Sequence, residues 1–304
     1  MKNNKKGKVV VTGGCGFIGS YLVDALVKEG FTVHIIGKSK NKKALHNKAV
    51  FHNANICNLK SIRPIIKGAR FVFHLASVVG EQYSVKQPTL SNRVNINGTL
   101  NVLLACQEAG VERLVYSSSS AIYGNQSKLP HREDMLPNPS APYGIQKYTG
   151  ELYCKIWSEL YKLSTVSLRY FSVYGPRPDL DYPRTLVIDR FLKNKMDDKV
   201  FHILGNGKRT RDFINVRDVV RANILAAKSK KVGKGEAINI GTGKNYSINE
   251  IAKLIGGNKI KHLPSKFGPT DTLADISKAK KLLGWQPKIK LEDGIKELKK
   301  IWKI

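Results

Sequence analysis

The chain has 304 residues, 41 % of them hydrophobic and 25 % charged, which is enough for a sizeable folded core and argues against a disordered or fibrous protein. Its apolar stretches fall well short of the roughly 20 residues that span a bilayer, and neither a signal sequence nor a disulfide or zinc pattern is apparent. We therefore expect a cytoplasmic protein with reduced cysteines, no membrane span and no metal site.

The formal net charge is +29, from 52 Lys and Arg against 23 Asp and Glu. Most of the excess consists of scattered lysines, without interleaved aromatic residues or a nucleic-acid-binding motif. We interpret it as a solvated basic surface suited to anionic small molecules, with no specific nucleic-acid partner.

The first 170 residues show alternating apolar patterns. They predict strands at 9–12, 31–36, 71–76, 113–117 and 165–171, separated by helices that include 21–29, 94–109 and 144–161. This alternation predicts an α/β fold with a doubly wound parallel Rossmann sheet, and residues 1–170 are assigned to the cofactor-binding domain. The remaining residues, 171–304, predict a smaller α/β substrate lobe, with about 213–242 returning to the Rossmann lobe. A capping box at Ser247 and Glu250 predicts a helix start within this second lobe.

A glycine-rich loop follows the first predicted strand and opens the first predicted helix. Gly13, Gly16 and Gly19 fall where a dinucleotide-binding loop needs a tight turn, a close approach to a pyrophosphate and close packing of helix on strand. The acidic residue expected about 20 residues further on, which would hold the adenosine ribose, is replaced by Gly37. Because Lys38 follows, NADP remains possible beside NAD.

Tyr143 and Lys147 are four residues apart in a predicted helix, so their side chains share one face. A phenol with an ordinary pKa of about 10 is a poor base at neutral pH, and a neighbouring ammonium lowers its pKa toward the working range. Ser119 lies at the end of a predicted strand, where parallel α/β sheets place their ligands. His74, at another strand end, is expected to be a hydrogen-bonded structural histidine.

Further motifs follow one another in a recognisable order, at residues 12–19, 73–76, 95–99, 117–124, 143–147, 168–176, 211–213 and 239–242. Together they resemble the extended short-chain dehydrogenase/reductases that act on nucleotide sugars, particularly the 4-epimerases. The resemblance covers nearly the whole chain. It implies an NAD-dependent enzyme that forms homodimers through two helices of the cofactor lobe.

By this resemblance Ser119, Tyr143 and Lys147 form the catalytic triad. The residues implied to bind the cofactor are Gly13, Gly16, Phe17, Ile18, Gly19, Lys38, Asn55, Ile56, Leu75, Ala76, Ser77, Asn95, Ser117, Tyr143, Lys147 and Tyr170. The residues implied to bind the substrate are Ser84, Ser119, Ser172, Arg177, Arg211, Lys266 and Thr272.

The resemblance also reduces the number of reactions that the chain is expected to catalyse. Related 4,6-dehydratases carry Asp-Glu directly after the catalytic hydroxyl residue, and related decarboxylases carry the Glu, whereas this chain has Ser120 and Ala121. The expected reaction is therefore C4 epimerisation of a UDP-hexose through a transient 4-keto sugar. An NADPH-dependent 4-keto sugar reductase remains an alternative, and a non-catalytic binding module is disfavoured by the complete triad.

The substrate is less constrained. In the resembling enzymes Arg211 matches a diphosphate ligand, with an ion pair to Asp212 or Asp218 as its structural alternative, and Lys266 replaces a second diphosphate arginine. Thr272 is small where a bulky residue restricts the pocket to plain hexoses, so N-acetyl sugars are expected to fit beside UDP-glucose and UDP-galactose. Ser172 and Arg177 resemble a branch that binds uronates, which keeps UDP-glucuronate 4-epimerase as an alternative.

Overall fold

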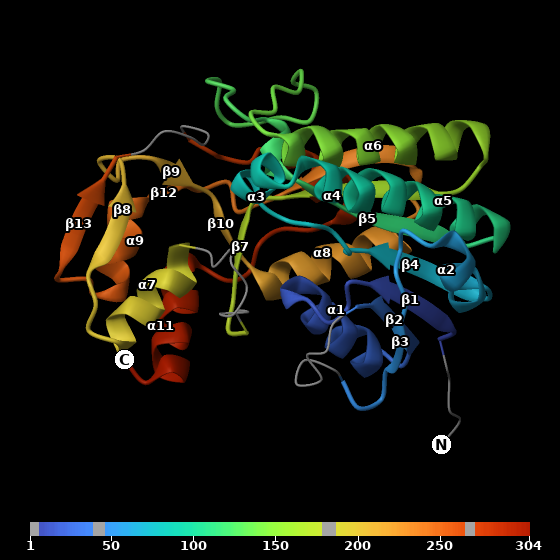
Figure 1. The fold of residues 1–304 in the computed structure, drawn as a ribbon, viewed down its shortest axis with the longest axis horizontal. Helices are drawn as coiled ribbons and strands as arrows, with labels where there is room; N and C mark the ends of the chain where they lie inside the picture. The colour runs from blue at the N-terminus through green and yellow to red at the C-terminus, as the bar shows by residue number, and fades with distance from the viewer. Residues whose placement is uncertain (1–5, 39–45, 178–186, 265–270) are drawn as a thin grey trace.

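The computed structural model describes residues 6–38, 46–177, 187–264 and 271–304. Its centre is a seven-stranded parallel sheet in the order β11-β6-β5-β4-β1-β2-β3 (Figure 1). The strands are β1 (Lys8–Thr12), β2 (Thr32–Gly37), β3 (Val50–Asn53), β4 (Ala69–His74), β5 (Arg113–Ser119), β6 (Thr165–Tyr170) and β11 (Lys234–Ile240). The predicted doubly wound Rossmann sheet is confirmed.

Two hydrophobic cores lie on opposite faces of this sheet. Val9 and Val11 belong to one core and Val10 to the other, because successive side chains of a strand point to opposite faces. The first core also contains apolar residues of α1 (Phe17–Lys28) and α8 (Val216–Lys228), and the second contains those of α2 (Leu59–Ile66), α5 (Gly98–Glu108) and α6 (Pro142–Leu160). Burial on both faces is why the strands read as continuous apolar runs.

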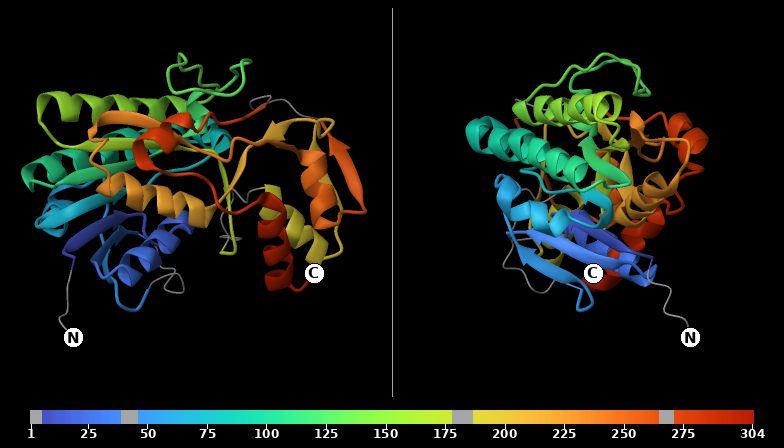
Figure 2. Two further views of the ribbon diagram at one scale, coloured as in Figure 1. Left: turned by 180° about the vertical axis from the view of Figure 1, so that it is seen from behind. Right: turned by 90° about the vertical axis from the view of Figure 1, so that its right-hand side faces the viewer.

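The C-terminal part of the chain adds a smaller lobe beside the sheet (Figure 2). Its core is formed mainly by α7 (Val187–Met196), α9 (Ile248–Ile255), α11 (Leu291–Trp302) and β8 (Phe201–Leu204). Strand β8 pairs in parallel with the more exposed β13 (Ile260–Leu263). The capping box predicted at Ser247 and Glu250 is present, and α9 ends at Gly256 in a left-handed conformation.

Helix α8 and strand β11 lie with the Rossmann sheet, although they follow the first elements of the smaller lobe in the sequence. Helix α8 packs on α1, and β11 forms the edge of the sheet beside β6. Two short two-stranded sheets complete the strands of the fold. Strand β7 (Ser172–Tyr174) pairs in parallel with β10 (Phe213–Asn215), and β9 (Thr210–Arg211) pairs antiparallel with β12 (Tyr246–Ser247).

Several elements differ from the sequence prediction. The helix expected at 94–109 begins as a π-helical turn, Arg93–Asn97, before α5. Strand β3 and helix α2 were not predicted, because β3 is an edge strand with exposed ends and α2 contains Pro64. The short helices α3 (Glu81–Lys86), α4 (Pro88–Asn92), α10 (Ser277–Leu283) and η3 (Ser120–Ile122) complete the described fold. Among the described residues, no helix is long and apolar enough to cross a membrane.

Candidate active site

The glycine-rich loop connects β1 to α1. Gly13 has a φ of +70°, and a Cβ there would come within 2.7 Å of the Ala76 nitrogen. A Cβ on Gly19 would lie 2.2 Å from the Gly13 oxygen, so α1 packs on the loop only if this residue is glycine. Gly16 caps α1, whose first residues are Phe17 and Ile18. The N-terminus of α1 thus presents backbone N–H donors and a positive dipole end, which suits the pyrophosphate of a dinucleotide.

Gly37 ends β2, where an acidic residue would hold the adenosine ribose. A Cβ at this position would meet Phe51 at 3.5 Å and the Cys15 sulfur at 3.8 Å, which are ordinary contacts. Packing therefore does not require glycine at this position. A larger side chain would fit, so the lack of a carboxylate here is not imposed by the neighbouring atoms. The exposed Lys38 follows directly, while Ser39 and Lys40 lie outside the described residues.

Asn55 and Ile56 lie just after β3, beside the end of β2. The Asn55 Oδ1 accepts a bond of 3.1 Å from the Cys57 nitrogen. Burial raises the pKa of the Cys57 thiol, while the charges of Arg93 and then Lys38 oppose that shift. Ile56 is buried, and its carbonyl accepts a bond of 2.9 Å from the Asn101 amide. The structure therefore brings these three predicted cofactor residues into one region at the β2–β3 edge.

His74 ends β4 and is fully buried. Its Nδ1 lies 2.7 Å from the Thr12 Oγ1 and its Nε2 lies 3.0 Å from the Thr99 Oγ1. Burial, and secondarily the charge of Lys147, lowers its pKa to about 3, so it stays neutral. The Thr12 hydroxyl also accepts the N–H of Ala76 at 3.1 Å. His74 therefore braces the segment of Leu75 and Ala76 beside the glycine loop, as expected for a structural histidine.

Asn95 lies in the π-helical turn and is almost fully buried. Its Oδ1 accepts bonds from the Ser77 hydroxyl at 2.9 Å and the Val78 nitrogen at 2.7 Å. Its Nδ2 donates to the Val78 carbonyl and the Gln146 Oε1, both at 2.8 Å. Asn95 thus ties the segment after β4 to α6, a positioning contact that the sequence analysis did not foresee.

Tyr143 and Lys147 lie on the first turns of α6, and both are buried. The Lys147 Nζ donates a bond of 2.7 Å to the Ser117 carbonyl and lies 5.8 Å from the centre of the Tyr143 ring. It also lies 5.1 Å from the ring of Tyr116 on β5. Burial lowers the pKa of Lys147 to about 7, while the charge of Glu151 opposes that shift. The Lys147 amino group is therefore held in a buried position beside the ring of Tyr143.

Ser119 ends β5, and its Oγ accepts a bond of 3.2 Å from the Ala121 nitrogen. Because the Ser119 oxygen acts as an acceptor in this bond, its hydroxyl hydrogen can donate a hydrogen bond to another group. Gly144 explains how α6 reaches this strand end: a Cβ on it would lie 2.5 Å from the Ala121 carbonyl oxygen. Close packing of α6 on η3 brings Ser119 and Tyr143 to the same edge of the sheet.

Two other predicted cofactor residues lie on neighbouring strands. The Tyr170 hydroxyl donates a bond of 2.9 Å to the Asn223 Oδ1 and is also bonded to Ser117, so it links β5, β6 and α8. Burial raises the pKa of Tyr170 above its usual value, which keeps it a neutral donor.

Ser84 is fully buried on α3. Its Oγ donates a bond of 2.7 Å to the Glu81 carbonyl and accepts one of 3.0 Å from the Tyr143 nitrogen. The hydroxyl predicted to contact substrate is therefore engaged with the backbone, where it supports the start of α6. Its predicted contact with substrate stays a prediction.

Arg211 ends β9 in the smaller lobe and is partly buried. Its Nη1 donates to the Thr210 carbonyl at 2.7 Å. Burial lowers its pKa, while the carboxylates of Glu81 and then Asp271 oppose that shift. Arg211 thus faces a carboxylate from the Rossmann lobe, which sequence reasoning missed because the two residues are 130 positions apart.

Asp212 and Asp218, the two carboxylates considered as structural partners of Arg211, bind other groups. Asp212 accepts bonds of 2.6–3.1 Å from the Thr242 hydroxyl and from the backbone N–H groups of Thr242, Gly243 and Ala274. Asp218 pairs with Arg221 at 2.6 Å and accepts from two backbone N–H groups, those of Lys288 and Ile289. Both carboxylates are therefore held by other groups, and diphosphate binding by Arg211 stays a prediction.

Ser172 and Thr272 both contact the backbone of Asp212. The Ser172 nitrogen donates to the Asp212 carbonyl at 3.0 Å, and the Thr272 Oγ1 accepts from the Asp212 nitrogen at 3.3 Å. Thr272 is buried and Ser172 is half-buried. Lys266 lies outside the described residues.

Arg177 contacts helix α1 of the Rossmann lobe. Its Nη1 is 2.7 Å from the Asp24 carboxylate, and its guanidinium stacks 4.5 Å from the ring of Tyr21, both on α1. The Arg177 side chain is half exposed. The prediction that it binds a uronate therefore requires Arg177 to leave this pair.

The described chain combines a parallel Rossmann sheet and a glycine-rich loop after β1 with Ser119, Tyr143 and Lys147, the residues predicted to form the triad. Residues 9–241 match the model of the NAD dependent epimerase/dehydratase family. The chain belongs to this family, as the sequence resemblance implied.

Several members are similar over their whole length. A UDP-glucuronate 4-epimerase of Thermodesulfobacterium geofontis is 36 % identical, with 95 % of this chain and 94 % of the relative covered. The structure of a UDP-glucose 4-epimerase of Thermotoga maritima with UDP-glucose superposes with a TM-score of 0.92 at 36 % identity, covering 97 % and 98 % of the two chains. That of a UDP-N-acetylglucosamine 4-epimerase of Methanobrevibacter ruminantium gives 0.91 at 34 % identity, covering 98 % and 99 %.

Proposed function

We propose that this chain inverts C4 of a UDP-hexose, namely UDP-glucose, UDP-galactose or their N-acetyl forms, through a transient 4-keto sugar. The observation that carries the proposal is the buried Lys147 ammonium beside the Tyr143 phenol, at the strand edge that also carries the dinucleotide loop. NAD, when bound in this loop, supplies the hydride acceptor and later the hydride donor for C4. The chain is a nucleotide-sugar 4-epimerase on this basis and on its family membership.

The residues of the chain handle the proton. Tyr143 takes the proton of the sugar 4-hydroxyl and later returns it, because the Lys147 cation stabilises the phenolate. Ser119 donates a hydrogen bond to the same sugar oxygen and so orients it. Buried side chains on α6 and β5 hold these groups in place, which removes much of the entropic cost of reaching the reactive geometry.

The turn after the catalytic serine supports epimerisation over elimination. Ser120 and Ala121 form the start of η3, and neither side chain titrates usefully. Loss of water or of carbon dioxide from the sugar needs an acid or base at this point, which these residues do not supply.

A neutral sugar is favoured over a uronate by two contacts. Arg177 is paired with Asp24, and the carboxylate of Glu81 faces Arg211 at the site. UDP-glucuronate is kept as a second candidate, because Ser172 matches the uronate-binding branch and a similar relative acts on this sugar. An NADPH-dependent reductase is the third, favoured by Gly37 beside Lys38.

The proposal also includes a homodimer in the cytoplasm. The exposed apolar residues Ile145, Leu152 and Ile156 recur at seven and four positions along α6, so they form one stripe on the outer face of this helix. Such a stripe is suited to packing against the same helix of a second copy. Light scattering of the wild type and of Ile156→Glu tests this, with a dimer expected only for the wild type.

The test of the reaction is an NMR time course with NAD supplied and no reductant. UDP-glucose, UDP-N-acetylglucosamine and UDP-glucuronate are incubated separately with the protein. The C4 epimer of a neutral sugar supports the proposal, and epimerisation of UDP-glucuronate alone moves the assignment to the second candidate. No reaction in any sample, followed by consumption of NADPH with a 4-keto sugar, supports the reductase.

A further inference from the structure

A buried ion pair between Glu151 and Arg169 lies one helical turn after the catalytic lysine. Glu151 is one helical turn after Lys147 on α6, so the two side chains share a face of the helix. The side chains of Glu151 and of its partner Arg169 are 6 % and 4 % exposed, and Lys147 is 3 % exposed. Burying three ionisable groups together is costly unless each is paired, so the arrangement calls for a physical explanation.

The pair is forked and is tied to the strand end that holds Lys147. Arg169 donates through Nε at 2.9 Å to Oε1 of Glu151 and through Nη2 at 2.7 Å to Oε2. Ser118 donates a bond of 2.5 Å to the same Oε1. Ser118 stands between Ser117, whose carbonyl accepts the Lys147 ammonium, and the catalytic Ser119. The carboxylate of Glu151 therefore anchors the short segment on which both catalytic contacts depend.

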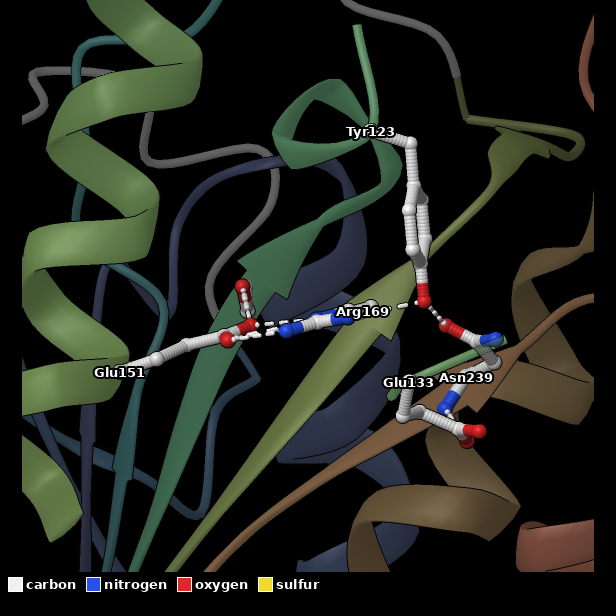
Figure 3. Close-up of polar contacts among 6 residues, drawn as sticks. Tyr123, Glu133, Glu151, Arg169 and Asn239 are labelled. Atoms are coloured by element: carbon white, nitrogen blue, oxygen red, sulfur yellow. Dashed lines mark hydrogen bonds and ion pairs between the residues drawn. The ribbon is translucent and has the colours of Figure 1, made fainter. Parts of the chain in front are cut away.

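A second layer of bonds fixes Arg169 from its other side (Figure 3). Its Nη1 donates to the Tyr123 hydroxyl at 2.9 Å, and this hydroxyl donates to the Asn239 Oδ1 at 2.7 Å. Ser118, Arg169 and Asn239 are paired in register across β5, β6 and β11. The chain of bonds thus runs across three strands and leaves the guanidinium little freedom to move.

The charges around Lys147 are unevenly distributed. The groups that face it are Glu151, Tyr143 and Cys154 on its own helix, Tyr116 on β5 and His74 on β4. The pKa of His74 lies far below neutrality and burial raises the pKa values of Tyr116 and Cys154, so these three groups are uncharged at neutral pH. Glu151 is the carboxylate in this set, and Arg169 on β6 neutralises part of its charge.

We propose that Glu151 is a positioning residue that keeps the Lys147 ammonium charged and, through Ser118, holds the end of β5 in its catalytic geometry, with Arg169 fixing the carboxylate. The proposal rests on the proposed function, since it assigns a role toward the proposed Tyr143–Lys147 pair. It also assigns a function to a buried charge pair that stability alone does not require, because apolar residues of similar volume often replace such pairs without loss.

The test measures the ionisation of Lys147 directly, without turnover. Protein labelled with ¹³C at the lysine Cε is titrated by NMR, and the Lys147 signal is assigned by its loss in Lys147→Met. Glu151→Gln keeps the shape of the side chain and removes its charge, so we expect the titration midpoint of Lys147 to fall by about one pH unit. Arg169→Lys keeps the cation and removes the fork, so its midpoint is expected to stay near that of the wild type.

The pH profile of kcat is the second readout. Both limbs are expected to move to lower pH in Glu151→Gln, because removing a negative charge favours deprotonation of both Tyr143 and Lys147. Arg169→Lys is expected to lower kcat without moving the limbs. A folded Glu151→Gln with an unchanged Lys147 midpoint overturns the proposal, and the pair is then only structural.

The two proposals fail separately. A wild-type protein without epimerase activity contradicts the proposed function, whereas the NMR titration still reports whether Glu151 controls Lys147. If Glu151→Gln does not fold, the double variant Glu151→Leu with Arg169→Leu removes the pair without leaving an unpaired charge. Its Lys147 midpoint is also expected to fall, and by less, because the positive charge of Arg169 is removed together with the carboxylate. An unchanged midpoint in this variant overturns the proposal.

Discussion

The side-chain nitrogen of Lys147 lies 2.7 Å from the carbonyl oxygen of Ser117, at the carboxyl end of β5. This bond places the ammonium between the strand that ends at Ser119 and the ring of Tyr143 on its own helix. The lysine is therefore directed toward the phenol and the strand end and away from solvent. The predictions below concern what each neighbour of this contact does.

Tyr143→Phe is expected to lower kcat by at least about 100-fold, because it removes the group that takes the proton. Folding and cofactor binding are expected to persist, since the bond to Ser84 is made by the backbone nitrogen of residue 143. Steady-state kinetics and thermal melts measure both effects. Tyr148→Phe on the same helix is the control, and near-full turnover in Tyr143→Phe would contradict the assignment.

Lys147→Met is expected to abolish turnover and to stabilise the fold, most strongly below pH 7. The pKa of Lys147 is about 7 in the folded protein, below its usual value of 10.5, so the unfolded chain binds more protons between these two values. Below about pH 7 the free energy of unfolding of the wild type is therefore reduced by the full cost of the buried charge. This cost falls as the pH rises from 7 toward 10.5, so the wild type becomes more stable over that range. We expect a rise in Tm of at least about 3 °C at pH 6 and a smaller rise at pH 9. Equal rises at both pH values would contradict the shifted pKa.

Arg211→Ala is expected to raise KM for the nucleotide sugar by about 10–100-fold with a smaller effect on kcat, because a guanidinium that grips a diphosphate binds substrate and transition state alike. Arg211→Lys should recover part of the loss, since lysine keeps the charge without the planar fork. Lys261→Ala, on the exposed strand β13, is the matched control for loss of a positive charge in the same lobe. An unchanged KM in Arg211→Ala would return Arg211 to a structural role.

Glu81→Gln is expected to increase kcat/KM for UDP-glucuronate relative to UDP-glucose by about 10-fold. The carboxylate of Glu81 acts on Arg211, so its removal takes a negative charge away from the substrate site. Competition between the two sugars in one reaction measures the ratio directly. The account is contradicted if the ratio stays the same or moves toward UDP-glucose.

Local patterns in the sequence were sufficient for much of the fold. Val9, Val10 and Val11 alternate between two cores, and the glycine spacing of the loop corresponds to contacts that no Cβ permits at Gly19. The pairing of Tyr143 with Lys147 follows from helical spacing, so it too was predictable.

Contacts between distant segments were not predictable in the same way. Arg177 pairs with Asp24, and Arg211 faces Glu81, because the fold brings together residues more than 100 positions apart. Arg169 was part of a recognised motif, yet its pairing with Glu151 depends on the register of β5 and β6 against α6. The charge and spacing of residues along the chain do not predict which distant residues the fold brings into contact.

The central claim is that C4 is oxidised and reduced again within one active site. UDP-glucose carrying deuterium at C4 tests it most directly, with NAD-supplied protein in ordinary water and NMR or mass spectrometry of the product. The account predicts UDP-galactose that keeps the deuterium at C4, because the same hydride is removed and returned. An epimer with hydrogen from water at C4, or a release of 4-keto sugar in step with reduced cofactor, would contradict it.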